Sequence, residues 1–436
     1  MSELETFQKL PLGGVDRRAL VASMSANGAR VAREDLTAAR KTLAPVPVNP
    51  PEGSVVLMLG GSGGILRALS IQLMFAQKVP VYGVHYDSEK LQIGAHHARA
   101  MMEGAAEAGV PCHFTNSDAT NPKTIDEVVA ALRGKFRVVH LVNGIAAGAT
   151  KRFAEHGPTK VRDLDVTFDP VRQIVDFSTW ASFRRAGLVD VEIATDAEIE
   201  RTYKFMGRST MPWAEALDAA GLLVRGESLV AFTDYEYEPD DPVYALGPLA
   251  KAKVLQRESM AEIKRRFGVR TARLAYPAMN TTALGAIPGG TLMFAGTAQL
   301  LLDQGTYQSI PDLARASVPL FDRDFTDYDV RYDLAFQSVL TEFHRRKALL
   351  TPENERTWFG KVFENPNLLA ERFDNFCAAR SGVRKKSTAW GRPGSSALKV
   401  SSGSTPGIGK LCDTIREPGF SFLSCGIRRS AMPGRM

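Results

Sequence analysis

Tyr244 and Lys253 are the residues whose types and spacing best suit chemistry in this sequence of 436 residues. A tyrosine hydroxyl can donate a hydrogen bond or a proton, and a nearby ammonium lowers the free-energy cost of the phenolate. Nine residues at about 100° each would place the two side chains on opposite faces of one continuous α-helix. We therefore expect the helix to begin between them, at Gly247-Pro248, because proline suits the first helical position. Lys251 is the alternative partner in an unbroken helix, and a structural tyrosine beside a solvated lysine is the alternative to catalysis.

A glycine-rich turn joins an apolar, strand-like segment at 54–60 to a predicted helix at 64–77. Backbone N–H groups in such a turn can approach a pyrophosphate closely, and the start of the following helix favours its negative charge. The predicted cofactor-binding residues of this turn are Gly60, Gly61, Ser62, Gly63, Gly64 and Ile65. A glycine turn taken alone is equally consistent with a structural role.

Acidic and small residues follow the next three predicted strands, along which a dinucleotide would extend. Tyr86 and Asp87 end the second strand. A carboxylate there accepts hydrogen bonds from ribose hydroxyls and repels a 2′-phosphate, which favours NADH over NADPH. Helix capping near Ser88 is the alternative role of Asp87. Asp118 and Ala119 would bind the adenine amine or form a turn, and Ile145 and Ala146 would accommodate the nicotinamide ribose or form a tight turn.

The predicted elements alternate between strand and helix over most of the chain. Predicted strands are 54–60, 80–85, 110–115, 137–142, 228–233 and 269–275, and predicted helices are 64–77, 89–108, 123–134, 196–206, 212–221, 248–267, 291–304 and 332–347. Such alternation is typical of parallel strands with right-handed crossovers, so we predict an α/β fold with a doubly wound parallel sheet of Rossmann-like type. We assign 1–50 to an N-terminal extension and 51–380 to a single domain. An insertion at about 150–195 is too long for a loop and is predicted to be functional.

The composition is that of a globular protein, with 44% hydrophobic and 23% charged residues. No apolar run approaches the roughly 20 residues that span a bilayer, and the N-terminus lacks the basic start and apolar block of a secretory signal. The four cysteines are widely spaced without a CxxC pattern, which favours reduced thiols in the cytoplasm. The histidines show neither metal-ligand nor catalytic-triad spacing, so we predict no metal.

Positive charge is concentrated in the C-terminal tail. Residues 381–436 contain ten Lys/Arg and two Asp/Glu, a formal charge of +8, whereas the rest of the chain carries −2. The body is therefore not predicted to bind nucleic acid specifically. Because the tail is rich in Ser and Gly without helical or strand periodicity, we expect it to be disordered. Contact with RNA or anionic lipid is the alternative.

From about residue 51 to about residue 376 the chain resembles the FabV-type enoyl-acyl-carrier-protein reductases, also called trans-2-enoyl-CoA reductases. This family is an enlarged branch of the short-chain dehydrogenase/reductase fold. The pair Tyr244–Lys253 matches its Tyr-x8-Lys signature, with the Gly-x-x-Gly/Ala-Lys-Ala-Lys ending. Residues 192–207 are similar to the helix before its catalytic strand. Residues 281–288 are similar to its loop near the cofactor, which implies a cofactor contact for Thr281.

Two positions depart from the family pattern. Leu66 stands where the glycine turn would end in a third glycine, so a side chain occupies a place of close packing. The family also has a second tyrosine ten residues before the signature tyrosine. Counting back without gaps gives Asp234, and a local shift of one residue gives Tyr235. The resemblance implies that one of these two side chains faces the substrate carbonyl, where a carboxylate would repel an enolate.

The sequence thus predicts a cytoplasmic, NADH-dependent reductase of a trans-2-enoyl thioester carried by acyl-carrier protein or CoA. The resemblance implies that Tyr244 hydrogen-bonds the thioester oxygen as an enolate forms and that Lys253 binds the nicotinamide ribose. Two alternatives remain open. One is a reductase of a specialised enone or ketone, motivated by Asp234. The other is a non-catalytic binding protein that retains the fold, motivated by Leu66 and Asp234.

Overall fold

The computed structural model describes residues 4–9, 16–87, 92–169, 171–172, 174–175, 183–325, 334–349, 351 and 354. All of them belong to one compact unit, Met1–Gly382. The basic tail at 381–436 lies outside the described residues, as does Ser88. Within the described part of the chain, no helix is both long enough and apolar enough to cross a membrane.

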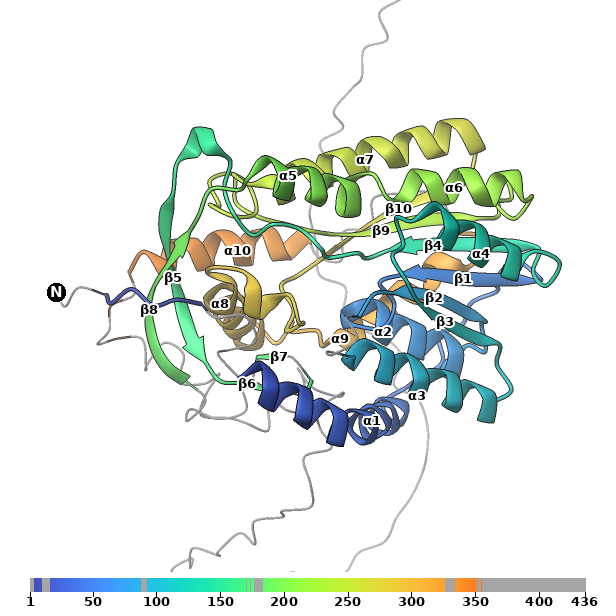
Figure 1. The fold of residues 1–436 in the computed structure, drawn as a ribbon, viewed down its shortest axis with the longest axis horizontal. Coiled ribbons are helices and arrows are strands. Elements are labelled where there is room, and N and C mark those ends of the chain that lie inside the picture. Colours follow the sequence, from blue (N-terminus) through green and yellow to red (C-terminus); the bar gives the residue numbers. More distant parts are fainter. Residues whose placement is uncertain are drawn as a thin grey trace, which may run out of the picture. The chain divides into compact units, whose positions relative to one another are not determined.

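Six parallel strands form the central sheet (Figure 1). They are β1 (Ser54–Leu59), β2 (Val81–His85), β3 (Cys112–Asn116), β4 (Val138–Asn143), β9 (Leu229–Tyr235) and β10 (Arg270–Tyr276), in the spatial order β10-β9-β4-β1-β2-β3. Each begins and ends within two residues of its predicted bounds. The strand order reverses between β1 and β4, which is the point where doubly wound sheets bind ligands.

Helices cover both faces of this sheet (Figure 1). One face carries α1 (Arg17–Lys41), α2 (Gly64–Ile71), α3 (Ile93–Glu107) and α9 (Ile310–Ser317), and the other carries α4 (Pro122–Leu132), α6 (Thr210–Ala219) and α7 (Pro248–Phe267). Successive residues of β1 point to opposite faces, with Met58 in the core beneath α2 and Leu57 in the core beneath α4. Both faces of the strand are therefore apolar, and the predicted fold class is confirmed.

An antiparallel ribbon, β5 (Thr159–Val166) with β8 (Phe183–Val191), lies within the segment 150–195 (Figure 1). The N-terminal segment lies along it, because the Phe7 N–H donates to the Leu188 carbonyl at 2.8 Å and the Leu188 N–H donates to the Glu5 carbonyl at 2.9 Å. The remaining elements are β6 (Phe168–Asp169), β7 (Ile174–Val175), α5 (Asp196–Thr202), α8 (Gly290–Asp303), α10 (Leu334–Lys347), two π-helical segments (Gln72–Ala76 and Tyr203–Gly207) and three 3₁₀ turns (Ala154–His156, Leu284–Ala286 and Val318–Phe321).

Candidate active site

The end of β9 sends neighbouring side chains to opposite faces of the sheet. Tyr235 points toward Tyr244, and the two rings meet edge to face with their centroids 4.7 Å apart. Asp234 points away, and its Oδ2 accepts hydrogen bonds from Arg257 at 2.8 Å and from Arg273 at 2.6 Å. Because side chains alternate along a strand, only one of these neighbours can face Tyr244. The structure places Tyr235 there.

Lys253 is buried, with 3% of its surface exposed, whereas Lys251 two residues earlier is exposed. Its Nζ donates to the Thr233 carbonyl at 2.5 Å and to Gln256 Oε1 at 3.2 Å. The ammonium also lies 5.6 Å from the centre of the Tyr235 ring. Burial lowers the pKa of Lys253 to about 8. The ammonium therefore carries its charge at neutral pH but holds its proton less firmly than an exposed lysine.

Tyr244 lies in the turn before α7, as the nine-residue spacing predicts. Asp241 Oδ1 accepts the Tyr244 N–H at 2.7 Å, which fixes the backbone of this turn. Gly247 then starts the helix, and a Cβ on this residue would lie only 2.1 Å from the Lys151 carbonyl oxygen. Burial raises the pKa of Tyr244, and the charge of Asp241 raises it further. Burial therefore outweighs the expected effect of a nearby ammonium, and the Tyr244 hydroxyl keeps its proton and acts as a hydrogen-bond donor.

The glycine turn after β1 has the backbone of a phosphate-binding turn. Gly60 and Gly64 have φ of +88° and +50°, a region that side chains disfavour. A Cβ on Gly60 would lie 3.1 Å from the Gly144 carbonyl oxygen, whereas a Cβ on Gly63 would meet nothing within 4 Å. No side chain caps the start of α2. The start of that helix thus has no side-chain cap, and space is open beside Gly63, an arrangement that fits a pyrophosphate. Gly61, Ser62 and Ile65 are buried around the turn.

Leu66 does not stand in that open space. It is 2% exposed, and its side chain packs against the backbone at Gly144, the residue after β4. A Cβ on Gly144 would lie 2.5 Å from Leu66 Cδ1, so the missing side chain at Gly144 makes room for the leucine. The departure from the third glycine is thus accommodated within the core.

Asp87 and Ser62 come together at the start of α3. Asp87 Oδ2 accepts the Ala95 N–H at 2.6 Å, so the carboxylate binds the first turn of this helix. A Cβ on Gly94 would lie 2.6 Å from Ser62 Oγ and 2.8 Å from Asp87 Oδ2. Burial raises the pKa of Asp87. Tyr86 beside it is 75% exposed, which leaves its ring free to cover a flat ligand.

The turns after β3 and β4 are held by side chains. Asp118 Oδ1 accepts the Thr120 N–H and hydroxyl, both at 2.7 Å, and the Ala119 carbonyl accepts the indole N–H of buried Trp213 at 2.8 Å. After β4, Asn143 Oδ1 accepts the Ile145 N–H at 3.0 Å. Both turns have the local hydrogen bonds expected of tight turns. Ala119 is buried, whereas Ala146 is exposed.

The loop at 281–288 joins the glycine turn to the tyrosine pair. A Cβ on Gly64 would lie 3.4 Å from Thr281 Cγ2. Two residues further on, Ala283 packs against the buried apolar cluster that Tyr235 and Tyr244 also contact. The glycine turn, the loop and the two tyrosines therefore form one continuous site at the carboxyl edge of the sheet.

Three features of this site were missed from the sequence. They are Asp241, which orients the Tyr244 backbone, the Thr233 carbonyl, and Gln256, both of which bind Lys253. Asp241-Pro242 carries a usable signal, because Asp before Pro favours the start of a turn. The other two depend on the packing of α7 against β9 and leave no local pattern.

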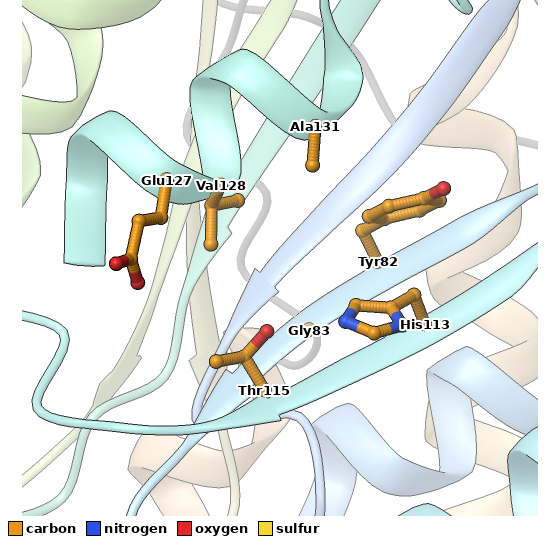
Figure 2. Close-up of a pocket in the computed structure, with 7 residues that line it drawn as sticks. All are labelled: Tyr82, Gly83, His113, Thr115, Glu127, Val128 and Ala131. Atoms are coloured by element: carbon orange, nitrogen blue, oxygen red, sulfur yellow. The ribbon is translucent and has the colours of Figure 1, made fainter.

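A separate pocket lies on the α4 face of β2 and β3 (Figure 2). It is lined by Tyr82, Gly83, His113, Thr115, Glu127, Val128 and Ala131. None of the residues predicted for cofactor, substrate or catalysis belongs to it. Among the described residues, no group of three or more His, Cys, Asp or Glu side chains is arranged to hold a metal ion.

The six-stranded parallel sheet with helices on both faces defines an α/β protein of Rossmann-like type. Residues 91–314, more than half of the chain, match the family described as the trans-2-enoyl-CoA reductase catalytic region. The chain belongs to this family, as its sequence resemblance predicts.

Similar proteins carry related names. An enoyl-[acyl-carrier-protein] reductase [NADH] of Colwellia psychrerythraea is 26% identical over 267 residues, which cover 58% of this chain and 65% of that protein. The enzyme of the same name from Tolumonas auensis is 26% identical over 289 residues, covering 63% and 72%. The matches thus span about two thirds of these relatives' lengths.

Two solved structures share the fold. The Clostridium acetobutulicum trans-2-enoyl-CoA reductase in complex with NADH has a TM-score of 0.64 at 18% identity, covering 86% of this chain and 94% of that one. The Treponema denticola trans-2-enoyl-CoA reductase in complex with NAD has a TM-score of 0.58 at 19% identity, covering 84% and 92%.

Proposed function

We propose that this protein reduces the trans-2 double bond of an enoyl thioester with NADH. The observation that carries the proposal is the pairing of Tyr244 with Tyr235 beside buried Lys253, joined by the Thr281 loop to a glycine turn. Family membership supports the same reaction, because the relatives are named as enoyl-acyl-carrier-protein and trans-2-enoyl-CoA reductases.

The residues at the carboxyl edge of the sheet fit NADH. Gly60 to Ile65 and the uncapped start of α2 would hold the pyrophosphate, and Asp87 would accept hydrogen bonds from the adenosine ribose. Asp118 and Ala119 would lie at the adenine, with Tyr86 over it, and Ile145, Ala146 and Thr281 would line the nicotinamide half. When bound, NADH supplies a hydride to the β-carbon of the enoyl group.

The two tyrosines act on the thioester oxygen. As the double bond is reduced, negative charge develops on that oxygen, and a preorganised donor stabilises it. Tyr244 keeps its proton because burial raises its pKa, so its hydroxyl donates a hydrogen bond to the oxygen. The Tyr235 hydroxyl is buried without a hydrogen-bond partner among the described residues, which makes it available as a second donor. The α-carbon then takes a proton from solvent or from Tyr244.

Lys253 positions the cofactor and the tyrosines. With the Thr233 carbonyl and Gln256 holding its Nζ, the ammonium would donate a further hydrogen bond to the nicotinamide ribose hydroxyls. Its charge beneath the Tyr235 ring also favours negative charge on the oxygen above. The carrier of the acyl group would be acyl-carrier protein or CoA, and we place the reaction in the cytoplasm, with no role for nucleic acid, a metal or a membrane span.

The test is NADH oxidation by the purified protein with crotonyl-CoA and longer trans-2-enoyl-CoAs. Enones and 3-ketoacyl thioesters assayed in parallel test the specialised substrate, and a fluorescence titration of NADH tests the non-catalytic alternative. We expect oxidation with the enoyl thioesters alone and micromolar NADH binding. Absence of oxidation together with tight NADH binding would contradict the proposed reaction while leaving the cofactor site intact.

A further inference from the structure

Asp234 lies directly behind the site rather than in it. Its backbone separates Thr233, whose carbonyl receives Lys253, from Tyr235, whose ring lies over Lys253. Its side chain points to the α7 face, where it is 4% exposed. A carboxylate in such a place is stable only if charges and hydrogen bonds compensate its lost hydration.

Two arginines from different elements provide that compensation. Arg257 of α7 and Arg273 of β10 both bind Asp234 Oδ2, at 2.8 and 2.6 Å, while Asp234 Oδ1 accepts the Tyr235 N–H at 2.9 Å. Arg273 also pairs with Glu236 at 3.3 Å. The carboxylate thus ties together the three elements that meet at Lys253, namely β9, β10 and α7.

We propose that Asp234 is a positioning residue of the reductase, which binds Arg257 and Arg273 behind the site and so holds the Thr233 carbonyl and the Tyr235 ring against Lys253. The proposal rests on the proposed function. It replaces a direct contact between Asp234 and substrate with an action through Lys253. It also predicts the direction in which the titration midpoint of Lys253 moves, because removing a negative charge and removing a positive charge must shift that midpoint in opposite directions.

The charged and titratable groups around Lys253 come from the elements that pack against it. Asp234 raises its pKa, and Arg257 and Arg273 lower it. α6 and the Tyr203–Gly207 segment also pack on α7, and they carry Glu215, Asp218 and Lys204. Glu215 pairs with Arg266 at 2.6 Å, and Arg208, which follows the segment, pairs with Glu200 at 2.8 Å. On the site side lie the aromatic hydroxyls of Tyr235 and Tyr244, both of which burial keeps neutral.

The direct experiment follows Lys253 itself, with no ligand present. In full-length protein labelled with ¹³C at lysine Cε, the resonance absent from Lys253→Arg is titrated by NMR. We expect a midpoint near 8 in the wild type. Asp234→Asn keeps the shape of the side chain and removes its charge, so the midpoint should fall by about one pH unit. Arg273→Gln should raise it by a similar amount. Glu258→Gln, which removes an exposed carboxylate from the next position after Arg257, should leave it unchanged.

The pH dependence of kcat/KM for NADH oxidation gives the second measurement. The proposed mechanism needs a protonated Lys253. The pH at which kcat/KM falls on the alkaline side should therefore be lower in Asp234→Asn and higher in Arg273→Gln, by the same amounts as the NMR midpoints. If folded Asp234→Asn titrates as the wild type does, the proposal is overturned. If Asp234→Asn does not fold, the upward shift in Arg273→Gln decides the question, and no shift there overturns the proposal. If the two variants show the expected NMR shifts but the wild-type protein does not reduce enoyl thioesters, only the proposed reaction is contradicted.

Discussion

Burial decides the protonation of the site at the scale of single residues. Burial is the largest influence on Tyr235, Tyr244 and Lys253, and in each case it favours the neutral form. The tyrosines therefore remain hydrogen-bond donors at any physiological pH. Lys253 behaves differently, because a pKa of about 8 lies close enough to neutrality for neighbouring charges to control its protonation. The tyrosines supply constant donors, and the lysine supplies a charge that depends on its surroundings.

In the proposed mechanism, Tyr244→Phe removes one hydrogen-bond donor to the thioester oxygen, while it leaves the ring and its packing against Tyr235 in place. Losing one donor of this kind costs about 10²–10³ in kcat. NADH affinity should stay unchanged, since the hydroxyl acts on the substrate. Tyr237→Phe is the matched control, because that ring lies 5.6 Å from Tyr235 in the same aromatic group. Steady-state kinetics and an NADH titration of both variants test the assignment, and unchanged turnover in Tyr244→Phe would refute it.

Lys253→Ala should weaken NADH binding and turnover together, because in the proposed mechanism the ammonium would contact the nicotinamide ribose, and it also lies against the Tyr235 ring. Lys251→Ala removes the same side chain from an exposed position on the same helix and should change neither quantity. NADH affinity from fluorescence and kcat from the enoyl-CoA assay distinguish the two. Equal losses in both variants would show that the effect comes from α7 as a whole.

At the scale of elements, what could be predicted from sequence depended on how local the signal was. The strand at 229–235 and the helix at 248–267 are marked by an apolar run, a turn and Gly247-Pro248, so their bounds were predicted almost to the residue. Helix α1 was missed, since its apolar residues are sparse and meet α3 only in the folded chain. The ribbon β5–β8 was also missed, because its pairing is non-local.

The choice between Asp234 and Tyr235 shows the same limit more sharply. A shift of one residue moves a side chain to the other face of a strand, and nothing in the local sequence fixes that register. The partners that decide it, Arg257 and Arg273, lie 23 and 39 residues away. Sequence reasoning therefore narrowed the position to these two neighbours but could not assign the face of the sheet that each side chain occupies.

The contact between α2 and β4 depends on a complementary pair, Leu66 and Gly144. Gly144→Ala alone would place its Cβ 2.5 Å from Leu66 Cδ1, and overpacking of this kind costs about 1–3 kcal/mol of unfolding free energy. Leu66→Ala alone leaves a cavity and costs about 2–5 kcal/mol. Combined, the two changes should cost clearly less than their sum, because each relieves the other.

Urea unfolding of the two single variants and the double variant measures this coupling. Leu132→Ala provides the control, because Leu132 is buried in the core on the opposite face of the sheet. Its cost should add to that of Gly144→Ala. Additive costs for Leu66→Ala and Gly144→Ala would mean that the two residues do not share the space described here.

At the scale of the whole molecule, the N-terminal segment connects the ribbon β5–β8 to the loop at 281–288. Phe7 is buried against the ribbon, and Lys9 binds both Asp163 of β5 and the loop before α8. Its Nζ donates to Asp163 at 2.5 Å and to the Ile287 carbonyl at 2.7 Å. Asp163 has no exposed side-chain surface and also accepts the Gly289 N–H at 2.9 Å, at the start of α8. One buried ion pair thus connects the first described residues to the loop that lines the site.

Lys9→Met should lower the unfolding free energy by about 3 kcal/mol, because it leaves the buried Asp163 carboxylate without its cation. Lys123→Met breaks an exposed pair with Glu127, whose atoms are 3.7 Å apart, and should cost at most about 1 kcal/mol. Denaturant unfolding of the two variants gives the comparison. Because Lys9 also holds the carbonyl of Ile287, which packs in the same buried cluster as Tyr235 and Tyr244, Lys9→Met should in addition raise KM for the enoyl thioester. A variant as stable as wild type, with the same KM, would mean that the N-terminal segment does not support the substrate side of the site.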